Sequence, residues 1–137
     1  MASKDATRWV RFALIDALKS LNIEGMANRW YPQQIPPNQT FPYGFVGVPI
    51  MTLEQIQCMD ASTIRFAIHA YTVGETPANK ISERLVELDG AHLDLQSVGC
   101  PYPATLDLTF VNSTPVRDAS ENSIFHLIVN MVAEVTA

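Results

Sequence analysis

The amino-acid sequence predicts an α+β fold in which two helices pack on one face of a mostly antiparallel or mixed sheet of about four to six strands. Three observations support this class. Apolar residues recur with helical spacing over residues 7–21. Between Ile64 and Gly90 an alternating strand leads into a second amphipathic helix, and two further alternating segments follow it. A long polar connection between those last two segments predicts a projecting hairpin loop.

Length and composition indicate a single domain over residues 1–137. Of the 137 residues, 47% are hydrophobic, and a domain of this size buries about two thirds of the surface that its unfolded chain exposes. The formal net charge is -5, and the nine Lys and Arg residues are scattered. Proteins that hold a nucleic-acid backbone cluster such residues in order to neutralise phosphates. The charge pattern therefore argues against a nucleic-acid-binding protein.

Cysteine usage and hydropathy indicate neither a metal site nor a membrane span. Cys58 and Cys100 lack the paired short spacings of a zinc site, and the first residues contain no apolar signal-peptide segment. Arg11, His126 and Asn130 interrupt the longest apolar stretches, well short of the roughly 18 uninterrupted apolar residues that a membrane span requires. We therefore expect a protein of a reducing cytoplasm with no membrane contact.

The first predicted helix covers Thr7–Leu21, and Gly25 is suited to end it. Six apolar residues fall on one stripe and predict a face against the core. They are Val10, Ala13, Leu14, Ala17, Leu18 and Leu21.

The opposite side of this helix also carries apolar residues. At about 100° per residue, Phe12 and Ile15 fall there, among polar residues that include Arg8. Single apolar residues at a surface are ordinary and need no partner. The alternative is that another subunit covers this helix face.

Prolines dominate the stretch Met26–Pro42 and predict an extended loop, because proline fixes φ and removes a backbone donor. A short strand over Arg29–Tyr31 is compatible with this loop. A strand over Tyr43–Val48 follows, and Pro49 is typical of the end or the edge of a strand. The pattern of Met51–Met59 is weaker and predicts at most an edge strand.

The segment Ile64–Val73 is the clearest predicted strand. Its faces alternate, with Ile64, Phe66, Ile68 and Ala70 on one and Arg65, Ala67, His69 and Tyr71 on the other. This alternation predicts a sheet with one buried face and one mixed face.

The helix after this strand has both start and stop signals. Thr76 is a candidate N-cap residue, Pro77 fits the first helical position, and Gly90 suits the left-handed position after the last turn. Its apolar stripe consists of Ala78, Ile81, Leu85 and Leu88.

Three strands are predicted after this helix. Leu93–Val98 is a short strand, Cys100–Pro103 a stiff turn, and Thr105–Val111 and Ile124–Val135 are strands that pair. The link Asn112–Ser123 is polar and longer than the commonest hairpin loops, so we expect it to project from the body.

No residue pattern typical of catalysis, cofactor binding or metal binding is present. His69 and His126 lie in predicted strands and His92 just beyond a helix, with neither an i,i+4 pair nor an HExxH spacing. The sequence contains no nucleophile elbow, P-loop or dinucleotide-binding glycine motif. An enzyme would require His69, His126 and a carboxylate to converge in a cleft. We expect no catalytic residues, no cofactor and no metal.

Several short motifs occur in a recognisable order. The aromatic-Pro-Tyr strand FPYGFVG follows a proline-rich approach, His69 lies in the central strand, and Gly74 precedes the second helix. Asp118 and His126 lie around the last turn. With the leading helix, this order resembles the tail terminator, or tail completion, proteins of long-tailed bacteriophages and related gene-transfer particles. The similarity spans nearly the full chain, except for a stretch before the central strand.

The resemblance implies a structural role in a virion. Tail terminators are similar to tail-tube subunits in forming a six-fold ring, which caps the growing tube at its set length and offers its other face to the head connector. The implied partners are further copies in a homohexamer, the tail tube protein, and a neck or head-connector protein. DNA would pass through the lumen without sequence-specific binding, and an acidic ring would let it pass without sticking. The implied location is the tail–neck junction of a virion assembled in the host cytoplasm.

The residues suggest where such contacts lie. A head-to-tail ring needs two different, complementary lateral surfaces. The hypothesis for the subunit interface is Arg8, Phe12 and Ile15 on the first helix, together with His69 and Tyr71 on the mixed sheet face. The hypothesis for the loop that docks on tube or neck is Pro115, Val116, Arg117, Asp118 and Glu121.

Two other functions are compatible with the sequence. Another neck component, such as a head-closure or head-to-tail joining protein, would have a similar size and composition. A small cytosolic ligand-binding module would have a deep apolar cavity against the sheet.

Overall fold

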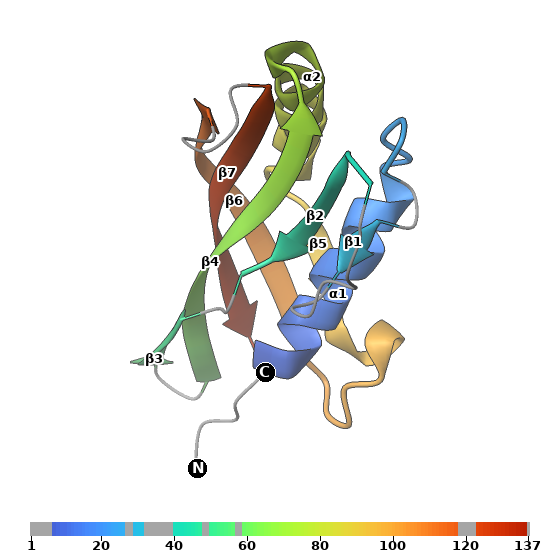
Figure 1. Ribbon diagram of the computed structural model, residues 1–137. Helices are drawn as coiled ribbons and strands as arrows, with labels where there is room; N and C mark the ends of the chain where they lie inside the picture. The colour runs from blue at the N-terminus through green and yellow to red at the C-terminus, as the bar shows by residue number, and fades with distance from the viewer. Residues whose placement is uncertain are drawn as a thin grey trace.

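The computed structural model describes residues 7–26, 29–31, 40–47, 50–56, 59–117 and 123–136. The helices are α1 (Thr7–Ser20) and α2 (Glu75–Leu85), with two short 3-10 helices, η1 (Val86–Leu88) and η2 (Leu95–Val98). The strands are β1 (Trp30–Tyr31), β2 (Tyr43–Val46), β3 (Ile50–Ile56), β4 (Met59–Val73), β5 (His92–Asp94), β6 (Thr105–Arg117) and β7 (Ile124–Thr136). Figure 1 shows their arrangement.

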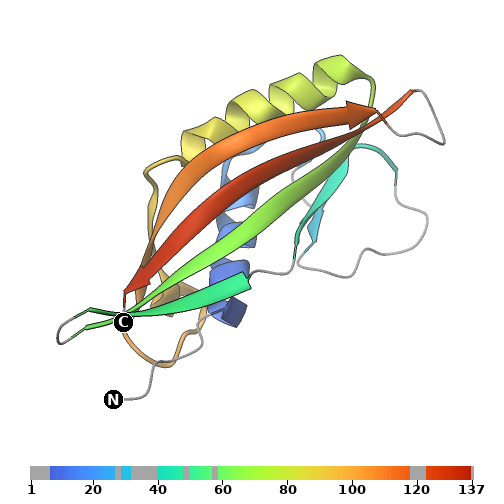
Figure 2. The same cartoon turned by 90° about the vertical axis from the view of Figure 1, so that its left-hand side faces the viewer.

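The seven strands form one sheet in the order β1-β2-β4-β7-β6-β5, and β3 pairs with β4 as well. The pair β1–β2 is parallel and the other pairs are antiparallel. Both helices lie on one face, and no helix of the described chain covers the other, which faces the viewer in Figure 2. The predicted fold class is confirmed. Two very short strands, β1 and β5, bring the number to seven, against the four to six expected.

The core lies between the sheet and the two helices. Alternate residues of β4, β6 and β7 join the apolar stripes of α1 and α2 in one buried cluster. Its most deeply buried members include Leu14, Leu18, Ile64, Ile68, Leu85, Leu106, Leu108 and Leu127. Burial of each such side chain stabilises the fold by about 1.5–3 kcal/mol. Both predicted helix stripes and the buried face of the central strand are therefore confirmed.

The start of α2 differs from the prediction. Gly74, not Thr76, is the N-cap residue, and its φ of 96° is one that glycine adopts without strain. The chain turns directly from β4 into α2, so Thr76 and Pro77 lie inside the first helical turn. Backbone N–H groups in the first turn have no intrahelical partner, so the proline, which lacks an N–H, costs the helix no hydrogen bond there. At the other end, Gly90 has the predicted left-handed conformation, with a φ of 79°.

Only the first part of the predicted strand Leu93–Val98 is a strand. Asp94 ends β5, and its carboxylate accepts a hydrogen bond of 3.0 Å from the amide of Gln96. The hydroxyl of Ser97 donates to the Asp94 carbonyl at 2.6 Å. These local bonds favour the turn η2 over a continued sheet ladder. The strand prediction is therefore wrong after Asp94.

The predicted loop Asn112–Ser123 is strand over its first half. β6 continues to Arg117, which pairs with Phe125 of β7. A bulge between Phe110 and Asn112 shifts the register by one residue and breaks the alternation that marks a strand in the sequence. Among the described strands, β6 pairs beyond the bulge with β7 alone, so Pro115 lies on an edge, where proline is tolerated.

Other predictions near the edges of the fold are confirmed in part. The short strand expected at Arg29–Tyr31 is β1, and the weak segment after position 50 is β3, which pairs with β4 alone among the described strands. The centre of the proline-rich loop, residues 32–39, lies outside the described residues, as does Pro49. Within the described part of the chain, no helix has the length and apolar character needed to cross a bilayer.

Candidate functional site

The face of the sheet opposite the helices, here called the open face, displays the mixed set of β4 side chains that the sequence predicts. Side chains alternate across a strand, so burying Ile64, Phe66 and Ile68 against the helices turns His69 and Tyr71 to the other side. Both rings are half-buried there. The predicted placement of these two residues on a mixed face is confirmed, while their part in a subunit interface stays a prediction.

The strand register arranges the open face in rows. One row consists of Thr114, Ile128, His69 and Phe45, and the next of Val116, His126, Tyr71 and Tyr43. Val73 and Ile124 pair one row further on, and Val73 is 55% exposed. At the far end of the same face, the rows contain Asp107, Glu134 and Thr63, then Thr109, Val132 and Arg65. The open face is therefore aromatic and apolar near the β6–β7 turn and polar at its other end.

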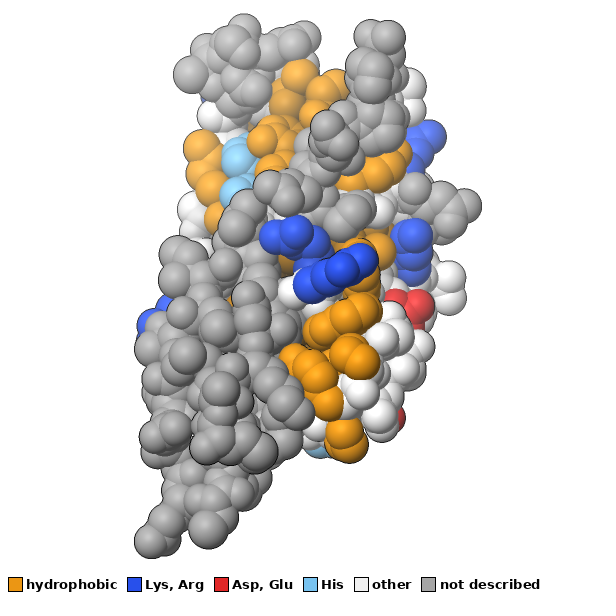
Figure 3. Space-filling view, turned by 90° about the horizontal axis from the view of Figure 1, so that it is seen from below, with side chains coloured by type: hydrophobic (Ala, Val, Ile, Leu, Met, Phe, Trp, Pro, Cys, Tyr) orange, Lys and Arg blue, Asp and Glu red, His pale blue; other side chains and the backbone are white. Residues whose placement is uncertain are grey.

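Six rings in continuous contact, some stacked and some tilted, form the aromatic–histidine cluster at the apolar end. Its members are Phe41, Tyr43, Phe45, His69, Tyr71 and His126. Phe45 stacks on His69 with ring centres 4.6 Å apart, and Tyr71 stacks on His126 at 4.3 Å. Tyr43 joins Tyr71 at 5.2 Å, and Phe41 joins Tyr43 at 5.5 Å. The cluster thus ties β2, β4 and β7 together on the open face, and Figure 3 shows histidine side chains bordered by hydrophobic ones.

The two histidines of this cluster are in direct contact. Nδ1 of His69 lies 2.7 Å from Nε2 of His126, which is a hydrogen bond in which one ring donates and the other accepts. Burial of the ring, and secondly the charge of His126, lower the pKa of His69 below its usual 6.5. The sequence does not reveal this pairing, because 57 residues separate the two positions.

Two glycines let β2 approach the cluster closely. A Cβ atom at Gly44 would lie 2.5 Å from Cζ3 of Trp30, and one at Gly47 would lie 3.2 Å from Nε2 of His69. Both positions therefore favour the absence of a side chain, as expected for glycines that allow close packing.

Side-chain pairs across strands occur both at the polar end of the open face and in the row next to the cluster. His92 and Asp107 form an exposed pair with Nδ1 and Oδ1 2.7 Å apart, and the amide of Asn130 donates to Oδ1 of Asn112 at 2.8 Å. A shallow groove of about 330 Å³ lies at the bulge, between Arg65, Ala67, Val111, Asn130 and Val132.

The outward side of α1 has an aromatic and cationic surface. The guanidinium group of Arg8 lies 5.2 Å from the ring centre of Trp9 and 5.7 Å from that of Phe12, which is 37% exposed. Ile15 differs from the expectation of an outward residue, because it is half-buried and packs against the core. The prediction groups it with Phe12 from helix geometry alone, but the core reaches further around the helix than a single stripe.

The residues predicted to form a docking loop do not lie on a loop where the structure describes them. Pro115, Val116 and Arg117 belong to β6, and all three are exposed. The guanidinium group of Arg117 lies over the ring of Phe125, 5.6 Å from its centre. Asp118 and Glu121 lie outside the described residues, and the docking role of all five stays a prediction.

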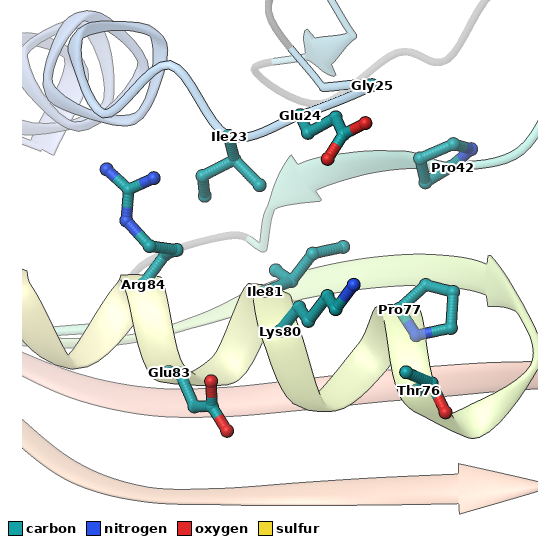
Figure 4. Close-up of a pocket in the computed structure, with 10 residues that line it drawn as sticks. All are labelled: Ile23, Glu24, Gly25, Pro42, Thr76, Pro77, Lys80, Ile81, Glu83 and Arg84. Carbon is teal, nitrogen blue, oxygen red and sulfur yellow. The ribbon is translucent and has the colours of Figure 1, made fainter.

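A larger groove of about 490 Å³ runs between α2 and the loop that follows α1 (Figure 4). Ile23, Pro42, Pro77 and Ile81 give it apolar walls, while Glu24, Lys80, Glu83 and Arg84 lie at its rim. Arg84 also donates to the carbonyl of Leu21 at 2.6 Å and is paired with Glu87. The bond to Leu21 joins the loop to the helix beside the groove.

The arrangement offers little for catalysis. His69 and His126 do converge, but apart from Thr114 the side chains that share their rows on the described strands are aromatic or aliphatic, and the open-face carboxylates Asp107 and Glu134 lie at the opposite end of the sheet. No group of three or more His, Cys, Asp or Glu among the described residues is placed to hold a metal ion. The described arrangement presents aromatic and histidine rings on the open face of the sheet.

Sequence reasoning missed the contribution of β2 to this site. Phe41, Tyr43 and Phe45 alternate in FPYGFVG, and a period of two puts such residues on one face of a strand. That alternation is the signal that could have placed them beside His69. The partner strand could not be read from it.

Comparison with solved structures finds chains of similar fold, one of which is described here. No protein-family model matches the sequence, and no curated protein matches it. The fold is similar to that of a virion chain. That chain belongs to the solved structure of the virion of a native gene transfer agent (GTA) particle, with a TM-score of 0.65 and 16% sequence identity. The match covers 96% of this chain and 93% of that one. At this identity, the likeness establishes a shared fold.

Proposed function

We propose that this protein is a structural component of a phage-like or gene-transfer virion, and more specifically a tail terminator. In this role, six copies form a ring that caps the tail tube, ends its elongation and presents its other face to a neck or head-connector protein. The particle location is the tail–neck junction, and assembly takes place in the cytoplasm of the host. The protein is not an enzyme and works without a cofactor.

The observation that carries the proposal is the extent of the fold similarity to a gene transfer agent virion chain. It covers 96% of this chain and 93% of that chain, so it involves the whole domain and not one common motif. The motif order of the sequence, from FPYGFVG to the last strand, independently resembles tail terminators.

The two exposed surfaces of the subunit fit a ring. A ring of identical subunits closes through head-to-tail contacts, in which each subunit uses two different surfaces. The outward side of α1, with Arg8 and Phe12, points away from the core, and the open face with His69 and Tyr71 lies on the other side of the sheet. Aromatic and arginine side chains are the types enriched at the centres of protein interfaces.

The charge of the chain suits a ring through which DNA passes. A net charge of -5 makes non-specific adhesion to phosphates unfavourable, since such adhesion depends on clustered cations. In this proposal, DNA crosses the lumen without sequence-specific contacts.

Deletion of the gene, with wild-type complementation as the control, tests the function. We expect abnormally long or unfinished tails together with filled heads that have not joined them, and normal particles after complementation. Normal-length tails joined to heads in the deletion strain would rule the proposal out.

Electron microscopy of purified particles separates the terminator from other neck components. A six-fold ring of this protein seated directly on the last tube layer is the expected result. A ring that contacts only the portal side would identify a head-closure or joining protein instead.

A further inference from the structure

The contact between His69 and His126 limits the number of protons that the two rings can hold. At 2.7 Å, Nδ1 of His69 and Nε2 of His126 share one hydrogen atom. The neutral pair satisfies this requirement, and so does a pair with one imidazolium, which donates to the neutral ring. Two imidazolium rings would place an N–H on each facing nitrogen and two like charges in contact. The second proton therefore cannot bind while the rings stay in place.

Neighbouring side chains hold both rings in this position. Phe45 of β2 stacks on His69, and Tyr71 of β4 stacks on His126. On another side of His69, Gly47 approaches so closely that even a Cβ atom would lie 3.2 Å from Nε2. A ring that is forced to move must therefore leave the stack with Phe45.

The other titratable or charged groups around the pair are few in the described part of the chain. From β2 and β4 come the phenol side chains of Tyr43 and Tyr71. From β7 and β6 come the aliphatic Ile128 and Val116 in the adjoining positions.

The nearest open-face cation in the register is Arg65, two rows from His69, and Asp107 and Glu134 lie beyond it. Arg117 lies on the other face, over Phe125. Within the described residues, the register of these four strands places no carboxylate in a position adjoining either ring.

β2 depends strongly on this cluster. It is joined to β4 by four residue pairs, and its other partner, β1, has only two residues. Both side chains that β2 turns to the open face in this region, Tyr43 and Phe45, belong to the stack. Separation of the histidine rings therefore removes the Phe45–His69 contact, one of the ring contacts that hold β2 on that face.

We propose that the His69–His126 pair is an acid-opened latch that fastens β2 to the sheet. Above the pH at which both rings become charged, at most one of the two rings is an imidazolium and β2 is held in place. When the second proton binds, the rings separate, the stack with Phe45 breaks, and β2 opens locally. The lowered pKa of His69, caused by burial and then by the charge of His126, agrees with this order of events. The latch belongs to the single subunit and does not rest on the virion role.

Hydrogen exchange measured by mass spectrometry tests the latch on the wild-type protein at about pH 7.5 and about pH 5, on either side of the ordinary histidine range. After correction for the pH dependence of intrinsic exchange, we expect the amides of Tyr43–Val46 to open at least about tenfold more often at the lower pH. The amides of α2 (Glu75–Leu85) serve as the internal reference and should change less than about twofold. Equal protection of β2 at both pH values would overturn the proposal.

Three substitutions identify the group responsible. His69→Gln and His126→Gln each keep a hydrogen-bonding side chain but remove one titration, so the acid response of β2 should be lost in both. His92→Gln is the matched control, because His92 pairs with Asp107 at the polar end and the response should persist. Retention of the response in both cluster variants, or its loss in His92→Gln, would contradict the assignment.

A titration of the histidine rings of the wild-type protein by NMR decides the question even if a variant does not fold. The pair should take up one proton near the ordinary histidine range and the second at least about one pH unit lower. Independent titration of both rings near their usual pKa would overturn the proposal.

Discussion

The indole ring of Trp30 in β1 lies directly against Gly44, its register partner in β2. A Cβ atom at position 44 would stand 2.5 Å from Cζ3 of Trp30 and 2.6 Å from the backbone oxygen of His69. A side chain at position 44 would meet the backbone of β4 on one side and the buried ring of Trp30 on the other. The position therefore has no room for a side chain.

Gly44→Ala should therefore lower the free energy of unfolding by about 1–3 kcal/mol, as expected for overpacking that forces backbone to move. Urea unfolding followed by tryptophan fluorescence measures this loss. Gly47→Ala is the graded control, because its Cβ would lie 3.1 Å from the oxygen of Ala67 and needs only a small shift. A Gly47→Ala loss equal to or larger than the Gly44→Ala loss would contradict this account.

Leu85→Ala should destabilise the subunit by about 2–5 kcal/mol, the range observed for truncation of a fully buried leucine. Leu85 is buried in the core between α2 and the sheet. The neighbouring Val86 is 46% exposed, so Val86→Ala should change the unfolding free energy by no more than about 0.5 kcal/mol. Chemical denaturation of both variants gives the comparison. Similar losses in the two variants would mean that α2 does not pack on the sheet as described.

Phe12→Asp should weaken assembly of the proposed ring without unfolding the subunit, because it puts a charge on the outward side of α1 and not in the core stripe. Ring formation on tail tubes, assayed by electron microscopy across a concentration series, is the measurement. Val86→Asp provides the control, since it adds the same charge at another exposed apolar position. Wild-type ring closure by Phe12→Asp would show that this side of α1 is not an interface.

The pH dependence of stability should carry the signature of His69. Its pKa is lowered in the folded state, so the unfolded chain binds more protons between the folded value and about 6.5. The contribution of this group to stability is therefore complete above about pH 6.5 and is lost as the pH falls toward the folded pKa. Urea midpoints of the wild type and His69→Gln, measured across this range, should converge at acidic pH because of this loss. If the stability difference between the wild type and His69→Gln grew as the pH fell, the pKa of His69 would be raised and not lowered by folding, which would contradict this account.

Replacement of residues 112–123 by a short Asn-Gly turn should lower the melting temperature. The sequence predicts a projecting docking loop there, whose shortening would leave stability unchanged, but Asn112–Arg117 pairs with β7 along its length, and Ser113 contacts Ser82 of α2 at 2.7 Å between the hydroxyl oxygens. Calorimetry of the shortened chain tests this. An unchanged melting temperature would show that the end of the hairpin contributes nothing to the fold, as expected for a loop.

Strong periodic patterns made much of the fold predictable. Apolar residues recur at the period of a helix in α1 and α2 and at the period of a strand in β4. Burying all three apolar faces places both helices on one face of the sheet. The left-handed conformation of Gly90 was also predictable, because the left-handed position after a helix favours glycine, which has no Cβ atom to clash.

The wrong boundaries and the wrong N-cap arise where local interactions or chain geometry compete with the pattern of residue types. Asp94 draws the chain into η2 by accepting a hydrogen bond from Gln96, and the bulge after Phe110 conceals six further residues of strand. Gly74 takes the N-cap position from Thr76 because the chain turns at once from β4 into α2. The turn at Asp94, the bulge and the cap at Gly74 each depend on backbone geometry that residue types alone do not predict.

By itself, the sequence determined the fold class, the buried faces and the presence of His69 and Tyr71 on a mixed face, because these depend on periods of two and about 3.6 within one segment. Only the tertiary structure decided that β2 lies beside β4, and that His69 and His126, 57 residues apart in the chain, touch at 2.7 Å. Strand pairing joins distant segments through backbone hydrogen bonds that are the same for every residue type, so the pairing is set by the packing of the whole domain and not by any one stretch of its sequence.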